Sequence, residues 1–108
     1  MKKSLLLTGA FALFSLVASA KTYDIALTGP AMAGSVQLAP GEYHVKVVGN
    51  NAVFTDQNNF KQFTAPVKVV KTAGKFDTTA VDSNKQNGTD RIQKIELGGS
   101  NTELDFSD

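Results

Sequence analysis

Hydrophobic and polar residues alternate with a period close to two through most of the chain after its first 20 residues. The clearest stretch is 43–48, where Tyr43, Val45 and Val47 alternate with polar residues. Successive side chains of a strand point to opposite faces of a sheet, so this alternation predicts strands with one buried face. No ten-residue stretch carries a helical stripe with caps, and at most a single helical turn is expected, near Ala31–Ala33.

About eight short strands are expected, separated by turns rich in Gly, Pro, Asn and Asp. They cover residues 23–27, 36–38, 43–48, 52–55, 60–70, 76–81, 92–97 and 103–106, and the most polar loop is 82–90. Their spacing of roughly ten residues is typical of an all-β fold, either a small antiparallel sandwich or a closed barrel. Asn87-Gly88 is expected to form a tight turn, although Asn87-Gly88-Thr89 also matches a glycosylation sequon.

Two irregularities favour the sandwich over the barrel. Pro66 interrupts the stretch 60–70, and proline cannot donate a ladder hydrogen bond, so the chain is expected to bend there or to lie at a sheet edge. Ile95 and Leu97 share one face, but Ile92 falls on the other, and a β-bulge would repair this mismatch. Both positions are interpreted as corners of a two-sheet structure.

The first 20 residues have the composition of a secretory signal peptide. Lys2 and Lys3 precede an almost wholly apolar run from Leu5 to Val17, and Ala18-Ser19-Ala20 provides small residues for cleavage. The apolar run is too short for a retained spanning helix, which needs about 20 residues. The chain is therefore expected to divide into a cleaved signal peptide, 1–20, and one β-domain, 21–108. The expected location is periplasmic or secreted, with no membrane insertion after cleavage.

The charge balance limits the classes of partner, and the cysteine content limits how the domain can be stabilised. The chain has 11 basic and 10 acidic residues, and loss of Lys2 and Lys3 leaves 9 basic residues against 10 acidic ones. This near-neutral balance gives no electrostatic reason to expect nucleic acid or an anionic membrane. The chain has no cysteine, so the domain must be stabilised without disulfides, by apolar packing, a closed sheet or self-association.

The segment Val36–Val47, which reads VQLAPGEYHVKV, contains the pattern L-x-P-G-x-Y-x-V-x-V. It resembles a hairpin of carboxypeptidase regulatory-like and prealbumin-like β-sandwich modules. Together with Gly49–Asp56 and Ile95–Phe106, it also makes the chain similar to a group of short secreted bacterial β-domain proteins. The regulatory-like resemblance implies an accessory role in folding support, adhesion or assembly, and neither resemblance supplies catalytic residues.

The residues that common catalytic sites require are largely missing. His44 is the only histidine, and no serine lies in a Gly-x-Ser-x-Gly elbow, so a Ser-His-Asp triad is not expected. One histidine without cysteine does not supply the usual zinc ligands. The polar segment that begins at Asp82 does not match an EF-hand loop. Such a loop needs glycine at its sixth position and glutamate at its twelfth, and these positions hold Asn87 and Gln93. We expect no enzyme activity, no metal and no cofactor.

Two functions from different classes remain. The first is a non-catalytic structural or interaction module that binds an unidentified protein or glycan partner or associates with itself. The alternative is a small-ligand or glycan-binding domain that uses the interior of a barrel or a patch around Phe60 and Phe63. These two rings are candidates because they fall on opposite faces of one expected strand and cannot both enter the same core. A two-layer core or a bulge between them would explain this placement equally well.

Overall fold

A computed structural model describes residues 21–106, which contain ten strands and no helix. The all-β fold class expected from the alternation is therefore confirmed. The expected signal peptide, residues 1–20, lies outside the described residues, as do the last two residues of the expected domain.

The first sheet is entirely antiparallel and has the strand order β1-β4-β5-β6. Its strands are β1 (Thr22–Leu27), β4 (Gly41–Val48), β5 (Asn51–Asp56) and β6 (Gln62–Pro66). The inward residues of β4, Tyr43 and Val45, are fully buried, while His44 and Lys46 point outward and are partly exposed. The alternation read from the sequence thus sets which face of this sheet is buried.

The second sheet is built around β9 and has the strand order β3-β2-β9-β10-β7, with β8 paired to the other edge of β9. Its strands are β2 (Ala31–Ala33), β3 (Val36–Leu38), β7 (Lys68–Lys71), β8 (Ala80–Gln86), β9 (Thr89–Glu96) and β10 (Thr102–Asp105). Strand β8 follows one edge of β9 from end to end. The opposite edge is shared, because β2 pairs in parallel with residues 90–92 and β10 pairs antiparallel with residues 94–96.

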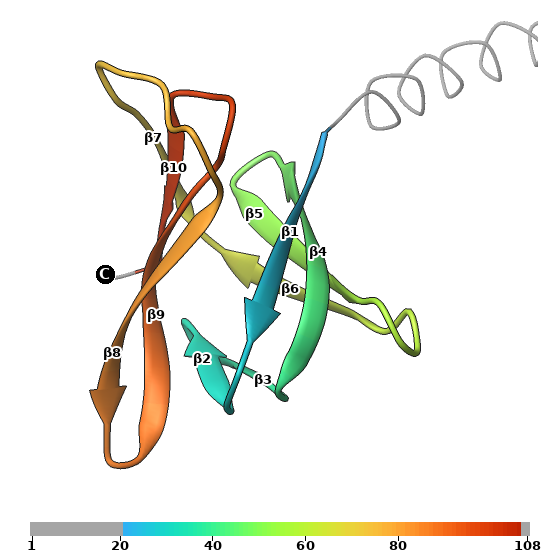
Figure 1. The fold of residues 1–108 in the computed structure, drawn as a ribbon. Helices are drawn as coiled ribbons and strands as arrows, with labels where there is room; N and C mark the ends of the chain where they lie inside the picture. The colour runs from blue at the N-terminus through green and yellow to red at the C-terminus, as the bar shows by residue number, and fades with distance from the viewer. Residues whose placement is uncertain (1–20, 107–108) are drawn as a thin grey trace, which may run out of the picture.

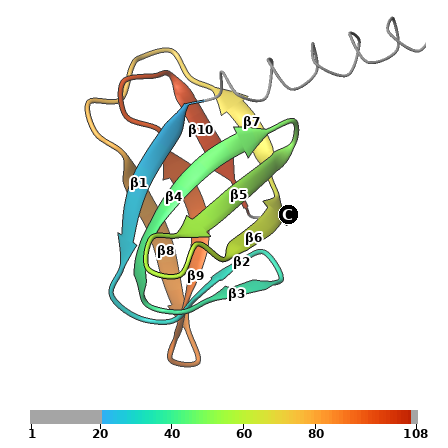
Figure 2. The same ribbon diagram turned by 90° about the vertical axis from the view of Figure 1, so that its right-hand side faces the viewer.

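The two sheets face each other around one core, and the described strands form two sheets and do not close into one barrel (Figures 1 and 2). Phe54 of the first sheet lies at the centre of this core. Its ring meets Tyr43 edge-on, with centroids 6.4 Å apart, and Phe106 of the second layer at 6.0 Å. Burial of these apolar side chains supplies the main stabilisation of a chain without disulfides.

The chain crosses from one sheet to the other directly after Pro66. Strand β6 ends at this proline, and β7 begins two residues later in the second sheet. Between them Val67 is buried, and its N–H donates to the carbonyl of Asn50 at 2.9 Å. The bend expected at Pro66 is confirmed, and it is one of three places, with the β1–β2 and β3–β4 connections, where the chain passes from one sheet to the other.

The bulge expected near Ile92 is also confirmed. In the pairing of β8 with β9, Asp82 lies opposite Lys94 and Ser83 lies opposite Ile92, so Gln93 is an extra residue in β9. Its carbonyl accepts a hydrogen bond from the N–H of Phe106 at 2.8 Å. The extra residue changes the phase of the strand, and both Ile92 and Ile95 are buried as a result.

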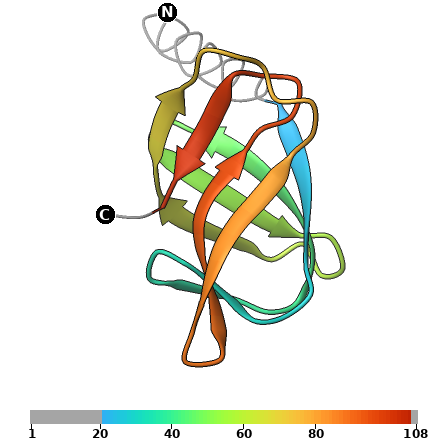
Figure 3. The ribbon, with the colours of Figure 1, turned by 60° about the vertical axis from the view of Figure 1, so that its left-hand side comes forward.

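Three expectations about individual elements are wrong. Ala31–Ala33 forms strand β2 and not a helical turn, because its two alanines are buried against the core. Residues 76–79 contain no strand, and residues 82–90, expected as a loop, form most of the β8–β9 hairpin (Figure 3). Strand β8 lies at a sheet edge with mostly exposed side chains, and its polar composition is therefore that of a loop. These differences, and the split of 60–70 into β6 and β7, account for ten strands in place of about eight.

The expected turn at Asn87-Gly88 is confirmed. Both residues have positive φ, 53° and 81°, as a two-residue hairpin loop requires. The segment Val36–Val47 forms a tight corner between β3 and β4. There the Tyr43 hydroxyl donates to the carbonyl of Ala39 at 2.6 Å, an arrangement like the tyrosine corner of β-sandwich domains.

Candidate functional site

The turn between β5 and β6 presents Phe60 to solvent. The ring is 75% exposed, and Phe60 is one of only two large hydrophobic residues among 21–106 that are exposed. Hydrogen bonds hold the turn on both sides of it: the Phe60 N–H donates to the Asp56 carbonyl at 2.8 Å, and the Asp56 N–H donates to the Lys61 carbonyl at 2.9 Å. The side-chain oxygens of Asp56 and Asn59 accept from the N–H groups of Asn58 and Lys61 at 2.8 and 3.0 Å.

The backbone of Phe60 lies in the left-handed region, with φ of 63°. A residue with a Cβ atom is strained in this region, at a cost on the order of 1–3 kcal/mol, and glycine or asparagine is usually found there. A further hydrogen bond, from the Gln57 N–H to the Glu42 carbonyl at 3.0 Å, joins the turn to β4. Phe60 is therefore held in place by its surroundings while its own side chain gains little from burial.

Phe63, the second predicted binding residue, lies in a different environment. It sits in β6 directly opposite Phe54 and packs against the core, partly buried. Phe60 precedes β6 and does not lie on it, so the two rings do not occupy opposite faces of one strand. Within residues 21–106 no ring contact joins them. The structure thus leaves Phe60 as an exposed aromatic contact and gives Phe63 a place at the margin of the core; the role of either in binding stays a prediction.

A row of polar side chains crosses the outer face of the first sheet and ends two residues after Phe60. The register places Asp24, His44, Thr55 and Gln62 opposite one another on successive strands. His44 Nδ1 and Asp24 Oδ1 are 2.5 Å apart, and Gln62 Nε2 donates weakly to Thr55 Oγ1 at 3.4 Å. The outer face of the first sheet next to the Phe60 turn is thus rich in hydrogen-bonding groups.

Asp24, His44 and Thr55 lie side by side on three neighbouring strands and have the residue types of a catalytic triad. Their surroundings differ from those of a triad. The side chains of His44 and Asp24 are 44% and 73% exposed, and none of the three residues lines a larger cavity of the described chain. Triad chemistry requires a substrate cleft and donors that stabilise an oxyanion beside the nucleophile. This row is therefore suited to polar contact on an open surface.

A concavity of about 650 Å³ lies beside β9, at the point where the neighbouring strand changes from β2 to β10. Its lining combines the β2–β3 turn, the bulge and the end of β10: Met32, Gly34, Ser35, Pro66, Arg91, Ile92, Gln93 and Phe106. Arg91 donates to the Gly34 carbonyl at 3.1 Å and to Gln86 Oε1 at 3.4 Å. Sequence reasoning missed this groove because its walls come from four distant segments; the phase change at Ile92 was the only local signal.

Acidic residues do not gather into an ion-binding cluster within 21–106. No group of three or more His, Cys, Asp or Glu side chains lies together there. In the hairpin that replaces the expected 82–90 loop, Asp90 is 3.5 Å from the Lys85 ammonium. The carboxylate of Asp90 thus already has a cation beside it.

No protein-family model, no curated protein and no solved structure matches the chain. Among the described residues, no helix has the length and apolar character needed to cross a membrane.

Proposed function

We propose that this protein is an exported, non-catalytic interaction module: a small β-sandwich that acts in the bacterial cell envelope or outside the cell by binding a protein or glycan partner. The observation that supports this is the exposed, conformationally strained Phe60 on a hydrogen-bonded turn. The proposed export rests on the signal-peptide pattern of residues 1–20.

The energetics of Phe60 favour contact over a role in the fold. A left-handed φ costs stability, and a ring that is 75% exposed recovers little of it by burial. A partner that covers the ring would gain about 1.5–3 kcal/mol from its burial. The rigid turn also lowers the entropic cost of binding, because the backbone is already ordered.

The surroundings of Phe60 suit a partner with many hydroxyl or amide groups. The polar row beside the turn offers carboxylate, imidazole, hydroxyl and amide groups on the outer face of the first sheet. Aromatic anchors with hydrogen-bonding groups around them are typical of binding surfaces. This geometry fits a glycan or an exposed polypeptide segment better than a small molecule that must be enclosed.

The test is binding of the purified protein to a glycan array and to isolated cell-envelope preparations from the source bacterium. Phe60→Asn removes the ring and accepts the left-handed backbone, so we expect a loss of about tenfold or more in affinity while the fold is retained. Val48→Asn is the matched control, since Val48 is the other exposed large hydrophobic residue and is 36% exposed. Equal loss in both variants, or none in Phe60→Asn, would refute the assignment of Phe60.

The groove beside Arg91 favours small-ligand binding as a second candidate function. Its volume of about 650 Å³ falls within the usual range for ligand sites, and Met32 and Phe106 provide apolar walls. A fragment screen by NMR on the purified protein would test it. Shifts confined to the groove residues are expected for a ligand site, and shifts spread over the whole surface would exclude it.

A further inference from the structure

A second, smaller cavity opens between the two sheets, beside the start of β1 and the end of β7. Both of these strand ends lie near the top of Figure 2. Its volume is about 250 Å³. Four apolar residues and three polar ones line it: Tyr23, Val47, Val69 and Leu97, and Lys21, Lys71 and Thr102. We call it the end slot.

The apolar residues of the end slot lie at the end of the core that the two sheets leave partly open. Tyr23 and Val47 belong to the first sheet and Val69 to the second, and all three are partly buried and packed against the core. Leu97, which follows β9, is 1% exposed and lies deepest. A ligand that fills the slot would cover apolar surface that the two sheets leave partly open, and burial of such surface is favourable.

The polar residues of the end slot carry only positive charge. Lys21 and Lys71 contribute two ammonium groups, and none of the lining residues among 21–106 is acidic. Neither lysine forms an ion pair with another residue of the described part of the chain, whereas Lys85 and Lys94 do. The Lys71 ammonium donates to Thr102 Oγ1 at 2.8 Å, and Thr102 is only 8% exposed. The ammonium of Lys71 is thereby positioned and keeps two donors for a ligand.

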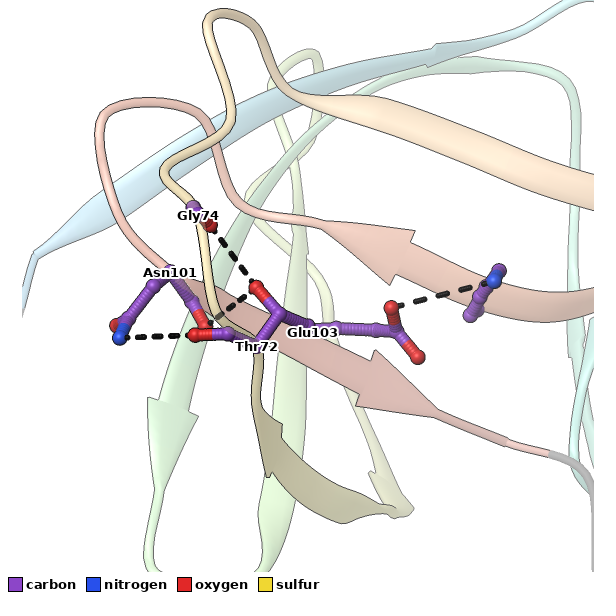
Figure 4. Close-up of polar contacts among 5 residues, drawn as sticks. Thr72, Gly74, Asn101 and Glu103 are labelled. Carbon is purple, nitrogen blue, oxygen red and sulfur yellow. Dashed lines mark hydrogen bonds and ion pairs between the residues drawn. The ribbon is translucent and has the colours of Figure 1, made fainter.

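The backbone next to Lys71 is fixed by contacts with the turn before β10 (Figure 4). The Thr72 N–H and hydroxyl both donate to the Asn101 carbonyl, at 2.8 and 3.2 Å. Asn101 Nδ2 donates back to the Thr72 carbonyl at 3.3 Å, and the Thr72 hydroxyl also lies 3.0 Å from the Gly74 carbonyl. The rim that carries Lys71 and Thr102 is therefore ordered before any ligand arrives.

We propose that the end slot binds a short-chain amphiphilic anion, namely a straight-chain monocarboxylate. Its alkyl tail lies between Tyr23 and Val69, and its carboxylate accepts hydrogen bonds from the Lys71 ammonium, with Lys21 as a second charge at the rim. The volume of about 250 Å³ lies just below the common range of ligand pockets, so we expect the tail to be short. This inference is independent of the contact role of Phe60.

Titration of the purified protein with butanoate, hexanoate and octanoate tests the proposal. Tyr23 lines the slot, and the chain has no tryptophan, so tyrosine fluorescence reports on occupancy together with calorimetry. We expect affinity to rise with tail length up to octanoate and to fall as salt is added. Octanol and octyltrimethylammonium carry an alkyl tail one carbon longer but no negative charge, and each is expected to bind at least about tenfold more weakly.

Substitutions of Lys71 at the rim test whether the affinity for octanoate depends on the lysine charge or only on the shape of the slot. Lys71→Gln is expected to weaken octanoate binding about tenfold and leave octanol binding unchanged, while Lys71→Arg retains the octanoate affinity. Lys61→Gln, an exposed lysine of the β5–β6 turn, is the matched control and should bind as the parent does. Equal affinity for octanoate and octanol, or no saturable signal at millimolar octanoate, would overturn the proposal.

Discussion

The aromatic residues Tyr43 and Phe60 are used in opposite ways. Tyr43 is fully buried, its ring packs against Phe54, and its hydroxyl has a hydrogen-bond acceptor in the Ala39 carbonyl. Phe60 is exposed and sits in a strained backbone conformation. Substitutions at the two positions should therefore change stability in opposite directions.

Replacement of the exposed ring is expected to stabilise the domain. Phe60→Asn relieves the cost of a left-handed φ, and asparagine tolerates this region, so the free energy of unfolding should rise by about 0.5–1 kcal/mol. Urea denaturation followed by circular dichroism measures the change. A decrease of similar size would show that the Phe60 ring stabilises the fold, and the argument for a contact role would then fail.

Removal of the Tyr43 hydroxyl should destabilise the domain and change its response to alkali. Tyr43→Phe deletes the hydrogen bond to Ala39, at a cost of about 1 kcal/mol. Burial, and next the Asp56 carboxylate, raises the pKa of Tyr43 above its ordinary value of 10.0. The folded state thus favours the neutral phenol, and this contribution is present below pH 10 and is lost as pH rises through the higher folded-state pKa.

The parent should consequently be more stable than Tyr43→Phe at neutral pH, and this advantage should shrink above pH 10. Chemical denaturation of both proteins at a series of pH values up to about 11 gives the two curves. Curves that stay parallel through this range would show that Tyr43 does not ionise with a raised pKa in the folded protein.

Strand β9 is the element on which the second sheet depends, since it pairs with β8, β2 and β10. Deletion of Gln93 removes the bulge and returns the strand to strict alternation. Ile92 or Ile95 must then turn outward, because a one-residue shift moves side chains to the other face. We expect a loss of about 3 kcal/mol or more in stability.

Gln93→Ala keeps the chain length and is the control, with an expected change below about 1 kcal/mol. Denaturation midpoints of the two variants and the parent make the comparison. A deletion variant as stable as the parent would mean that the phase of β9 is not set by this residue.

The β9–β10 turn approaches the loop before β8 so closely that only glycine fits at position 98. A Cβ atom there would lie 2.6 Å from backbone atoms of Thr78 and Thr79, and the Gly98 N–H also donates to Thr79 Oγ1 at 3.0 Å. Gly98→Ala should therefore cost about 1–3 kcal/mol. Gly74→Ala, in open space and without a positive φ, should cost little. Thermal unfolding of both variants shows whether the loss of stability comes from the close contact at position 98. Equal unfolding midpoints would show that this contact does not exclude a Cβ atom.

Elements were predictable where one face is buried and the other is exposed. The alternation of 43–48 and the phase change at Ile92 led to β4 and to the bulge, since both follow from local burial. Strand β8 was not predicted over most of its length, because an edge strand with exposed side chains on both faces shows no alternation of hydrophobic and polar residues. Strand β2 was missed because three residues are too few to establish a period.

Phe54 connects the two layers at the scale of the whole molecule, through Tyr43 on its own sheet and Phe106 on the other. Phe54→Leu removes both ring contacts and leaves a partly filled space, which should lower stability by about 1–3 kcal/mol. Both sheets share one core, so we still expect a single transition. Circular dichroism and NMR of residues from each sheet check this; separate transitions would show that the sheets unfold independently.

The architecture was predictable only in outline. An all-β fold follows from the period of two, but the parallel pairing of β2 with β9 depends on contacts between residues nearly 60 positions apart. The groove beside Arg91 and the end slot are assembled in the same way from distant segments. Phe60 was chosen from sequence, yet its exposure comes from the β5–β6 turn, which no local hydrophobic pattern specifies.

The β8–β9 hairpin extends beyond the rest of the molecule, and its tip is the turn Asn87-Gly88 (Figure 3). Neither residue of the tip is buried, and the strands on both sides are held in register by pairing with each other. A foreign peptide inserted between Asn87 and Gly88 would lower stability only by the entropy of closing a longer loop. This cost is about 0.6 kcal/mol for each doubling of the loop length. The hairpin thus offers a place to graft an epitope or a tag on a scaffold that needs no oxidative folding, because the chain has no cysteine.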